Sequence, residues 1–96
     1  MESIWKQPLE CANKQTVELP IGAKVLCVQT QQEKPCLWFI TPQTESPAVE
    51  ERTFAIRGTG HRHPQIDGRY IGTFQLQAGS LVFHVFEVEG GAARIL

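Results

Sequence analysis

The stretch Lys24–Thr41, which reads KVLCVQTQQEKPCLWFIT, decides the fold class. Its two ends, Lys24–Gln31 and Pro35–Thr41, are rich in β-branched, aromatic and other apolar side chains, the types that are enriched in strands or buried beside them. Gln32–Lys34 between them is short and polar, as the connection in a β-hairpin usually is. The stretch therefore predicts two antiparallel strands.

Five further segments on either side of this hairpin have the composition of short strands: Ser3–Leu9, Gln15–Leu19, Arg52–Arg57, Tyr70–Leu76 and Leu81–Val88. Pro8 indicates that the first lies at a sheet edge or ends there, because proline cannot donate to a ladder. The last is apolar on both faces up to Glu87, which favours a central position. Since no segment has a convincing helical period, the sequence predicts an all-β fold, a small sandwich or barrel of six to seven mostly antiparallel strands.

The chain of 96 residues has the length of one domain. We expect a single β domain over residues 1–89 and a flexible C-terminal tail over residues 90–96. Pro42–Val49 and Gly58–Arg69 are predicted to be loops, and Gln77–Ser80 a turn. A domain this small buries a modest share of its surface, so self-association into a homo-oligomer would stabilise it.

Charge and cysteine content narrow the function. The net charge of −1 argues against a long nucleic acid as partner, because such binding depends on a positive excess. Residues 1–8 have no apolar run of the kind found in a signal peptide, and no stretch is long enough to predict a membrane span. The three cysteines, Cys11, Cys27 and Cys36, are too scattered for a disulfide framework or a paired zinc motif, which favours a reducing, cytoplasmic location.

The segment RGTGHRHP at residues 57–64 is the most informative for binding. It lies within residues 52–69, which hold four arginines and two histidines against one acid. Glycines let the backbone approach a ligand, and successive N–H groups in such turns can form an anion-binding nest. Arginine can bind a phosphate in a bidentate manner. The candidate ligand-binding residues are therefore Arg57, Gly58, Thr59, Gly60, His61 and Arg62.

The alternative for the same segment is a plain turn between two strands with solvated side chains. No helix is predicted after it, so it matches neither a P-loop nor a dinucleotide-binding fingerprint. His61 and His63 with His84 suggest a zinc site only weakly, because no paired cysteines support it. His84 lies in an apolar strand and is interpreted as a histidine hydrogen-bonded within its sheet. We predict no catalytic residue, metal or cofactor.

Six segments in this order resemble a family of small, largely uncharacterised proteins encoded by bacteriophages and prophages. They are IWKQPLE at 4–10, QTVELPIGAKVLCVQ at 15–29, CLWFI at 36–40, RGTGH at 57–61, YIGTFQ at 70–75 and LVFHVFE at 81–87. The resemblance implies an accessory or counter-defence role in the infected bacterial cytoplasm. One such class consists of oligomeric sponges that sequester the cyclic nucleotide signals of bacterial immunity.

The resulting hypothesis is a non-enzymatic sponge for a small anionic ligand, in which the 57–62 segment holds phosphates and an aromatic ring, Tyr70 or Trp38, faces a base. Three rivals remain. The first is a protein-interaction module that uses a strand edge or an aromatic patch. The second is a small hydrolase or metal enzyme built on the histidines, and the third is a minor structural virion protein.

Overall fold

The computed structural model describes residues 1–41 and 48–89 and is all-β, as predicted. It contains seven strands and one short 3₁₀ turn at Gln77–Gly79. The strands are β1 (Ser3–Pro8), β2 (Lys14–Pro20), β3 (Lys24–Gln31), β4 (Lys34–Thr41), β5 (Val49–Gly58), β6 (Arg69–Leu76) and β7 (Leu81–Val88). The predicted tail at 90–96 and most of the predicted loop at 42–49 lie outside the described residues.

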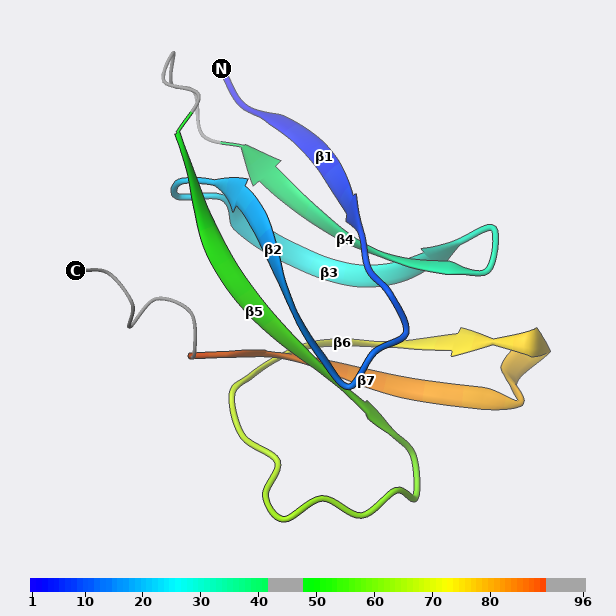
Figure 1. Cartoon of the computed structure of the whole chain (residues 1–96). Coiled ribbons are helices and arrows are strands. Elements are labelled where there is room, and N and C mark those ends of the chain that lie inside the picture. The colour runs from blue at the N-terminus through cyan, green and yellow to red at the C-terminus, as the bar shows by residue number, and fades with distance from the viewer. Residues whose placement is uncertain (42–47, 90–96) are drawn as a thin grey trace.

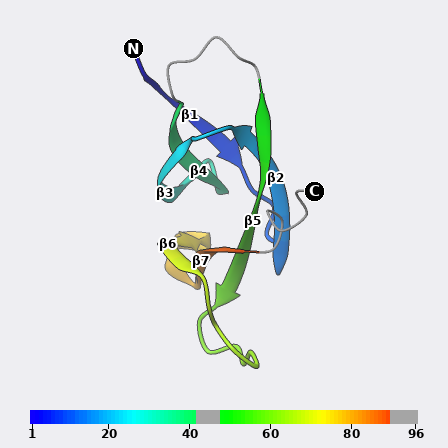
Figure 2. The ribbon, with the colours of Figure 1, turned by 90° about the vertical axis from the view of Figure 1, so that its left-hand side faces the viewer.

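The strands form two antiparallel sheets that pack as a small sandwich (Figure 1). The three-stranded sheet has the order β1-β4-β3, and the four-stranded sheet has the order β2-β5-β7-β6. Figure 2 shows β3 and β4 above β6 and β7, while β5 and β2 run along one side of the molecule. The edge position predicted for the first strand and the central position predicted for the last are both confirmed.

The predicted strand bounds differ from the observed ones by at most one residue, except at the start of β5. β5 begins at Val49 and not at Arg52, so part of the predicted loop at 42–49 is strand. The added residues pair with the end of β2, where Glu18 lies opposite Glu51 and Pro20 opposite Val49. Local composition is polar there, but the ladder with β2 extends the strand, which is a tertiary effect that the sequence alone does not reveal.

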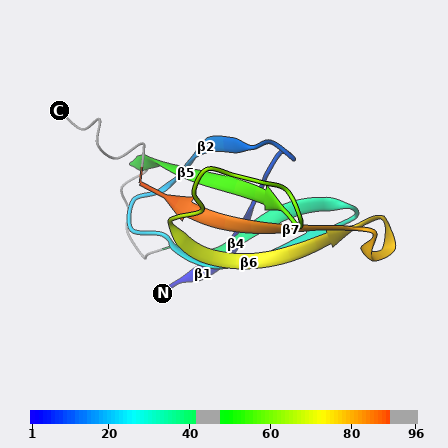
Figure 3. The same ribbon diagram turned by 90° about the horizontal axis from the view of Figure 1, so that it is seen from below.

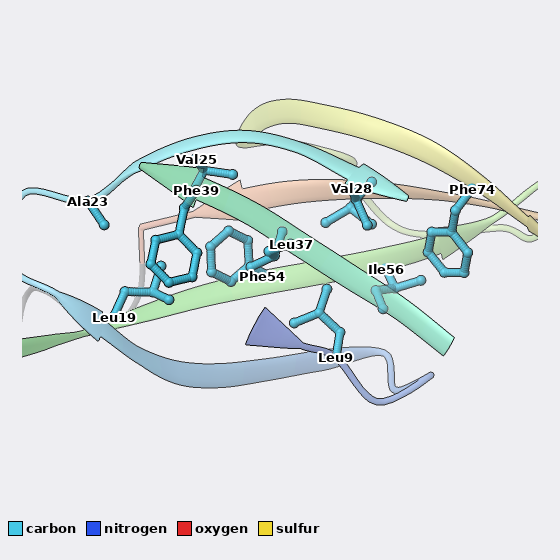
Figure 4. Packing of buried hydrophobic residues seen from close by; sticks show 11 residues of the cluster. Leu9, Leu19, Ala23, Val25, Val28, Leu37, Phe39, Phe54, Ile56 and Phe74 are labelled. Carbon is cyan, nitrogen blue, oxygen red and sulfur yellow. The ribbon is translucent and has the colours of Figure 1, made fainter. Parts of the chain in front are cut away.

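The core lies between the sheets and is built from every second residue of most strands (Figure 4). β5 contributes Phe54 and Ile56, β4 contributes Leu37 and Phe39, and β7 contributes Val85. Leu9, Leu19, Ala23, Val25, Val28 and Phe74 complete the buried cluster. Because side chains alternate across a strand, the intervening residues of the same strands point to the outer faces of the sandwich.

The two sheets approach most closely where β6 lies against β3. A Cβ atom at Gly72 would stand 3.0 Å from Val28 Cγ1 and 3.4 Å from the Val28 amide nitrogen. A side chain larger than that of glycine would fit here only if Val28 moved by a few tenths of an ångström, so glycine favours this close packing. β6 is bulged at this point, between Tyr70 and Gly72. β3 carries a comparable irregularity between Val25 and Cys27.

Two hairpin tips are tied together at one end of the sandwich. The β3–β4 turn has positive φ at Gln32 (54°) and Glu33 (64°), the combination of a two-residue hairpin turn that matches strand twist. The β6–β7 turn has positive φ at Gln77, Ala78 and Gly79. The Gln77 amide donates to Glu33 Oε1 at 3.0 Å, which joins the tips that lie at the right of Figure 1.

Candidate functional site

A row of polar side chains crosses the outer face of the four-stranded sheet. In the strand register Arg57 lies opposite His84, and His84 lies opposite Thr73. Their neighbours Ile56, Val85 and Phe74 belong to the core, so the alternation directs these three side chains outward. The row is thus built by β5, β7 and β6 together.

His84 is the centre of a hydrogen-bond network on this face. Its Nε2 lies 2.8 Å from Thr59 Oγ1, and its Nδ1 lies 3.0 Å from Thr73 Oγ1. The Thr73 hydroxyl also contacts the phenol oxygen of Tyr70. The Thr59 hydroxyl donates to the Val82 carbonyl at 3.0 Å. The prediction that His84 is hydrogen-bonded within its sheet is confirmed.

The Val82 carbonyl, which can only accept, determines which atom is the donor in each of these hydrogen bonds. A threonine hydroxyl has one proton, and that of Thr59 goes to Val82, so Thr59 Oγ1 accepts from His84 Nε2–H. In the neutral imidazole Nδ1 is then an acceptor and takes the proton of the Thr73 hydroxyl. Thr73 in turn accepts from Tyr70. The phenol of Tyr70 therefore donates inward and keeps its lone pairs toward solvent.

Arg57 is held in place by the residue before β2. Its Nη1 donates to Asn13 Oδ1 at 2.7 Å and makes a longer contact of 3.5 Å with the Asn13 carbonyl. Within the described part of the chain, Nε and Nη2 have no hydrogen-bond partner. These two nitrogens present the donor fork that binds a phosphate or carboxylate in a bidentate manner. Arg57 can therefore still donate hydrogen bonds to an anion, as predicted, through these two nitrogens.

The RGTGH segment begins as a tight turn. The His61 amide donates to the Gly58 carbonyl at 3.1 Å, and Gly60 has φ +84° at the third turn position, where glycine is favoured. The Thr59 amide donates to the Val82 carbonyl at 3.0 Å. Because the N–H groups of Thr59 and His61 are both engaged within the chain, they do not form the anion-binding nest that the glycine spacing predicted.

The three basic side chains that follow Gly60 in the loop differ in exposure. His61 and Arg62 are exposed, and the imidazole of His61 packs over Gly58. His63 Nε2, in contrast, is buried and has no hydrogen-bond partner among the described residues. A buried ring nitrogen is normally paired, so this atom is a place where a polar ligand atom or a water would be stabilised. Figure 2 shows the loop below the end of β5, and in Figure 3, which is seen from below, the loop lies in front of β5.

The two predicted aromatic residues are on different sheets. Tyr70 is 55% exposed on the same face as His84 and packs edge-on against Phe86, with ring centroids 5.6 Å apart. Trp38 lies on β4, between the buried Leu37 and Phe39, and so faces outward from the three-stranded sheet, where Lys6 lies over its ring. The fold brings Tyr70 to the candidate site and leaves Trp38 on the opposite side of the sandwich.

An open groove of about 1090 Å³ adjoins the row at Arg57. Five acidic and four basic side chains line it, together with Thr53, Gly68 and Val88: Glu50, Glu51, Asp67, Glu87, Glu89, Lys14, Arg52, Arg57 and Arg69. The mixed charge does not select strongly for an anion across the whole groove. Anion selectivity would have to come from its Arg57 end.

Arg52, which also lines this groove, uses its hydrogen-bond donors within the protein and stabilises the fold. Its Nε and Nη2 donate to Glu87 at 2.7 and 3.1 Å, and its Nη1 donates to the Ala23 carbonyl at 2.6 Å. The hydrogen bond to Glu87 raises the pKa of Arg52 above its ordinary value, against the opposing effect of burial. Arg52 therefore stays charged and joins β5, β7 and the turn after β2.

Sequence reasoning missed Asn13 and Thr73 and did not assign His84 to a site. Alternation predicts that Thr73 and His84 point to the same side of neighbouring strands only if the register is known. Asn13 comes from a turn 44 positions away from Arg57, and nothing local marks it. Cys36 on β4 and His84 on β7 lie in different sheets, so the fold does not pair them as a nucleophile and its base.

Two searches for other kinds of site gave negative results within residues 1–41 and 48–89. No group of three or more histidine, cysteine, aspartate or glutamate side chains is placed to hold a metal ion. No helix there has the length and apolar character needed to cross a membrane.

Comparison with known proteins assigns a family without a function. A family model described as a domain of unknown function (DUF7352) matches residues 1–95, and the chain belongs to this family. No curated protein matches the sequence, and no solved structure matches the fold. The site must therefore be interpreted from its own geometry.

Proposed function

We propose that this chain binds a small anionic ligand of the nucleotide class on the outer face of the four-stranded sheet and holds it without chemical change. The observation that carries the proposal is the cross-strand row in which Arg57 lies beside His84 and its network, with two donor nitrogens that have no partner among residues 1–41 and 48–89. The three strands thus place an oriented arginine next to a histidine whose two ring nitrogens are both held by threonine hydroxyls.

Arg57 supplies the phosphate contact. Asn13 holds one terminal nitrogen, so the guanidinium is oriented before a ligand arrives and loses less rotamer freedom on binding. Thr59 is already fixed by Val82 and His84, and the exposed His61 and Arg62 lie two and three residues further along the loop. The charge is local, which suits a small anion better than a long polyanion.

Tyr70 and Phe86 supply an apolar surface for a base. Their rings meet edge-on, and Tyr70 is more than half exposed. A base stacked on an aromatic ring gains roughly 1–3 kcal/mol. Hydrogen bonds run from the Tyr70 phenol through Thr73 to His84, and Arg57 lies opposite His84 in the strand register, so the aromatic and cationic ends of the site adjoin.

The biological role follows from the resemblance to small phage proteins. A cyclic oligonucleotide that signals infection is a small anion with aromatic bases, and a homo-oligomeric protein of this kind would sequester it in the cytoplasm of the infected bacterium. Such a phage counter-defence sponge needs affinity and abundance and no turnover.

A hydrolytic function is the rival that the same geometry suggests. Thr73 donates to His84 Nδ1, and His84 Nε2–H is oriented by Thr59, which is the order nucleophile, base and orienting group. The orienting group here is a neutral hydroxyl, whereas strong triads use a carboxylate that stabilises the imidazolium. This difference favours binding over catalysis.

Native mass spectrometry with a panel of cyclic di- and trinucleotides tests the proposal. We expect binding of whole, unmodified nucleotide and a loss of affinity of roughly tenfold to hundredfold in Arg57→Ala, because a hydrogen bond to a charged group contributes about 1.5–3 kcal/mol. Lys24→Ala removes the same charge from the three-stranded sheet and should bind normally. Cleaved nucleotide would support the hydrolase, and a protein that ignores the panel would refute the nucleotide proposal.

A further inference from the structure

We propose that two copies of this chain associate through β1, whose open edge pairs antiparallel with the same edge of the partner copy, centred on Ile4. The pairing joins the two three-stranded sheets into one sheet of six strands. It does not depend on the proposed ligand, because the candidate ligand site lies on the other sheet.

The first support is the direction of the backbone groups of β1. Ser3–Pro8 pairs with β4, with Pro8 opposite Cys36, and the Leu9 amide donates to the Pro35 carbonyl at 2.9 Å. Directly opposite residues that exchange such a bond form a hydrogen-bonded pair, and these pairs alternate along the ladder. The odd-numbered residues of β1 therefore bond to β4, and the N–H and C=O groups of the even-numbered residues point to the other edge, which no strand of the described residues pairs with.

The open edge is limited at its far end. Pro8 has no N–H group, and its carbonyl accepts from the side-chain amide of Gln7 at 2.9 Å. Pairing beyond this point is blocked. The open part of the edge is therefore the short stretch from Glu2 to Lys6, which excludes indefinite pairing along the strand and favours one defined register.

Charge selects that register. With Ile4 opposite Ile4 of the partner copy, Glu2 lies opposite Lys6 of the partner, and Lys6 lies opposite Glu2. All three pairs join even-numbered residues, whose backbone groups face the open edge. A register centred on Lys6 would instead place two lysines opposite one another, which is destabilising. The segment is thus complementary to itself in both backbone direction and charge.

The side chains of this segment are unusually exposed for their type. Ile4 is 62% exposed and Trp5 is 61% exposed, although both belong to a strand (β1 in Figure 1). In the proposed register the two Ile4 side chains meet directly. Trp5 lies opposite Ser3 of the partner, and the two tryptophans are diagonal neighbours, within reach of aromatic side chains. Association would remove this apolar surface from water.

A charge exchange tests the register. Glu2→Lys and Lys6→Glu each place like charges opposite one another, so each variant alone should sediment as a monomer in analytical ultracentrifugation at a concentration where the wild type is a dimer. The equimolar mixture should form a heterodimer, because every pair is again Lys opposite Glu. The double variant should dimerise with itself. Two single variants that stay dimeric, or a mixture that stays monomeric, would overturn the register.

A backbone variant tests the edge itself. Ile4→Pro removes an N–H group that points to the open edge and leaves the β4 ladder intact, so it should give a folded monomer by circular dichroism and ultracentrifugation. Ile66→Pro is the control, because Ile66 is also an apolar residue that is more than half exposed but lies outside the strands, and this variant should remain dimeric. A wild type that is monomeric at all accessible concentrations, or a folded Ile4→Pro dimer, would refute the proposal.

Discussion

Arg52 and Arg57 lie five positions apart on β5 but differ in the direction of their side chains and in the number of their hydrogen bonds. Arg52 points inward at the open end of the sandwich, with a side chain 15% exposed and three groups fixed by Glu87 and Ala23. Arg57 points outward, and in the described part of the chain its side chain is held by Asn13 alone. The comparison teaches that the number of satisfied donors separates an arginine that stabilises the fold from one that is available to a ligand.

Arg52→Ala should have the largest effect. It leaves Glu87 without its partner and the Ala23 carbonyl without its donor. We expect a loss of about 3 kcal/mol in the free energy of unfolding, near the lower end for breaking a buried ion pair, because the carboxylate is 19% exposed. Urea denaturation measures it. Arg57→Ala is the matched control, with an expected loss below about 1 kcal/mol. Equal losses would erase the distinction.

Thr59→Val should have a smaller effect that is specific to the outer row. It removes the acceptor of His84 Nε2–H and a hydroxyl bond to Val82, at a cost of about 1 kcal/mol. The neutral imidazole should also lose its preference for the Nε2–H tautomer, which ¹⁵N chemical shifts of the ring report. Thr16→Val, which breaks a similar hydroxyl pair with Thr53, should leave the tautomer unchanged.

Asn13→Ala should lower the free energy of unfolding by less than Thr59→Val does, and it should also weaken nucleotide binding. It frees the guanidinium of Arg57, so the arginine must be ordered by the ligand instead. We expect about 0.5 kcal/mol of lost stability and a threefold to tenfold weaker nucleotide affinity, since ordering a long side chain costs about 0.5–1.5 kcal/mol. Calorimetry separates the two quantities. An affinity loss as large as that of Arg57→Ala would mean that Asn13 touches the ligand itself.

For the pH dependence of the stability that Arg52 contributes, we expect no effect near neutral pH. The raised pKa of Arg52 means that the stability it contributes is fully present below its unfolded pKa and is lost only as pH rises through the folded value. The difference in unfolding free energy between wild type and Arg52→Ala should therefore not change through titration of Arg52 between about pH 6 and 9. Circular dichroism melts across this range check it, and a slope from deprotonation of Arg52 would contradict the assignment.

The strands were predictable because their signals are local. β3, β4 and β7 are apolar enough to be recognised without their partners, and the Gln32–Glu33 turn separates two clear runs. The start of β5 was not predictable, because Glu50 and Glu51 are polar and belong to the strand only through their pairing with β2. Of the candidate site residues that the sequence predicted, Arg57, Thr59 and Tyr70 lie on one face.

The rest of the site depends on register between strands that are distant in sequence. Thr73 reaches His84 across a hairpin that contains a bulge, and Asn13 reaches Arg57 across more than forty residues. Trp38 was grouped with the loop by chemistry alone, while the division into two sheets separates them. Register and sheet membership are set by the whole core, so no local pattern could supply them.

The topology also has a kinetic consequence. The β3–β4 and β6–β7 hairpins join neighbouring segments, and hairpins of this kind close in about 1–10 μs. β1 must find β4 across the pair Ser3–Thr41, and β2 must find β5 across the pair Lys14–Ala55. Distant pairings of this kind slow the folding of β sandwiches to the millisecond-to-second range. Until β1 docks, the folding chain exposes the unpaired edge of β4, so the interval before that step is when it is most open to mispairing with other chains.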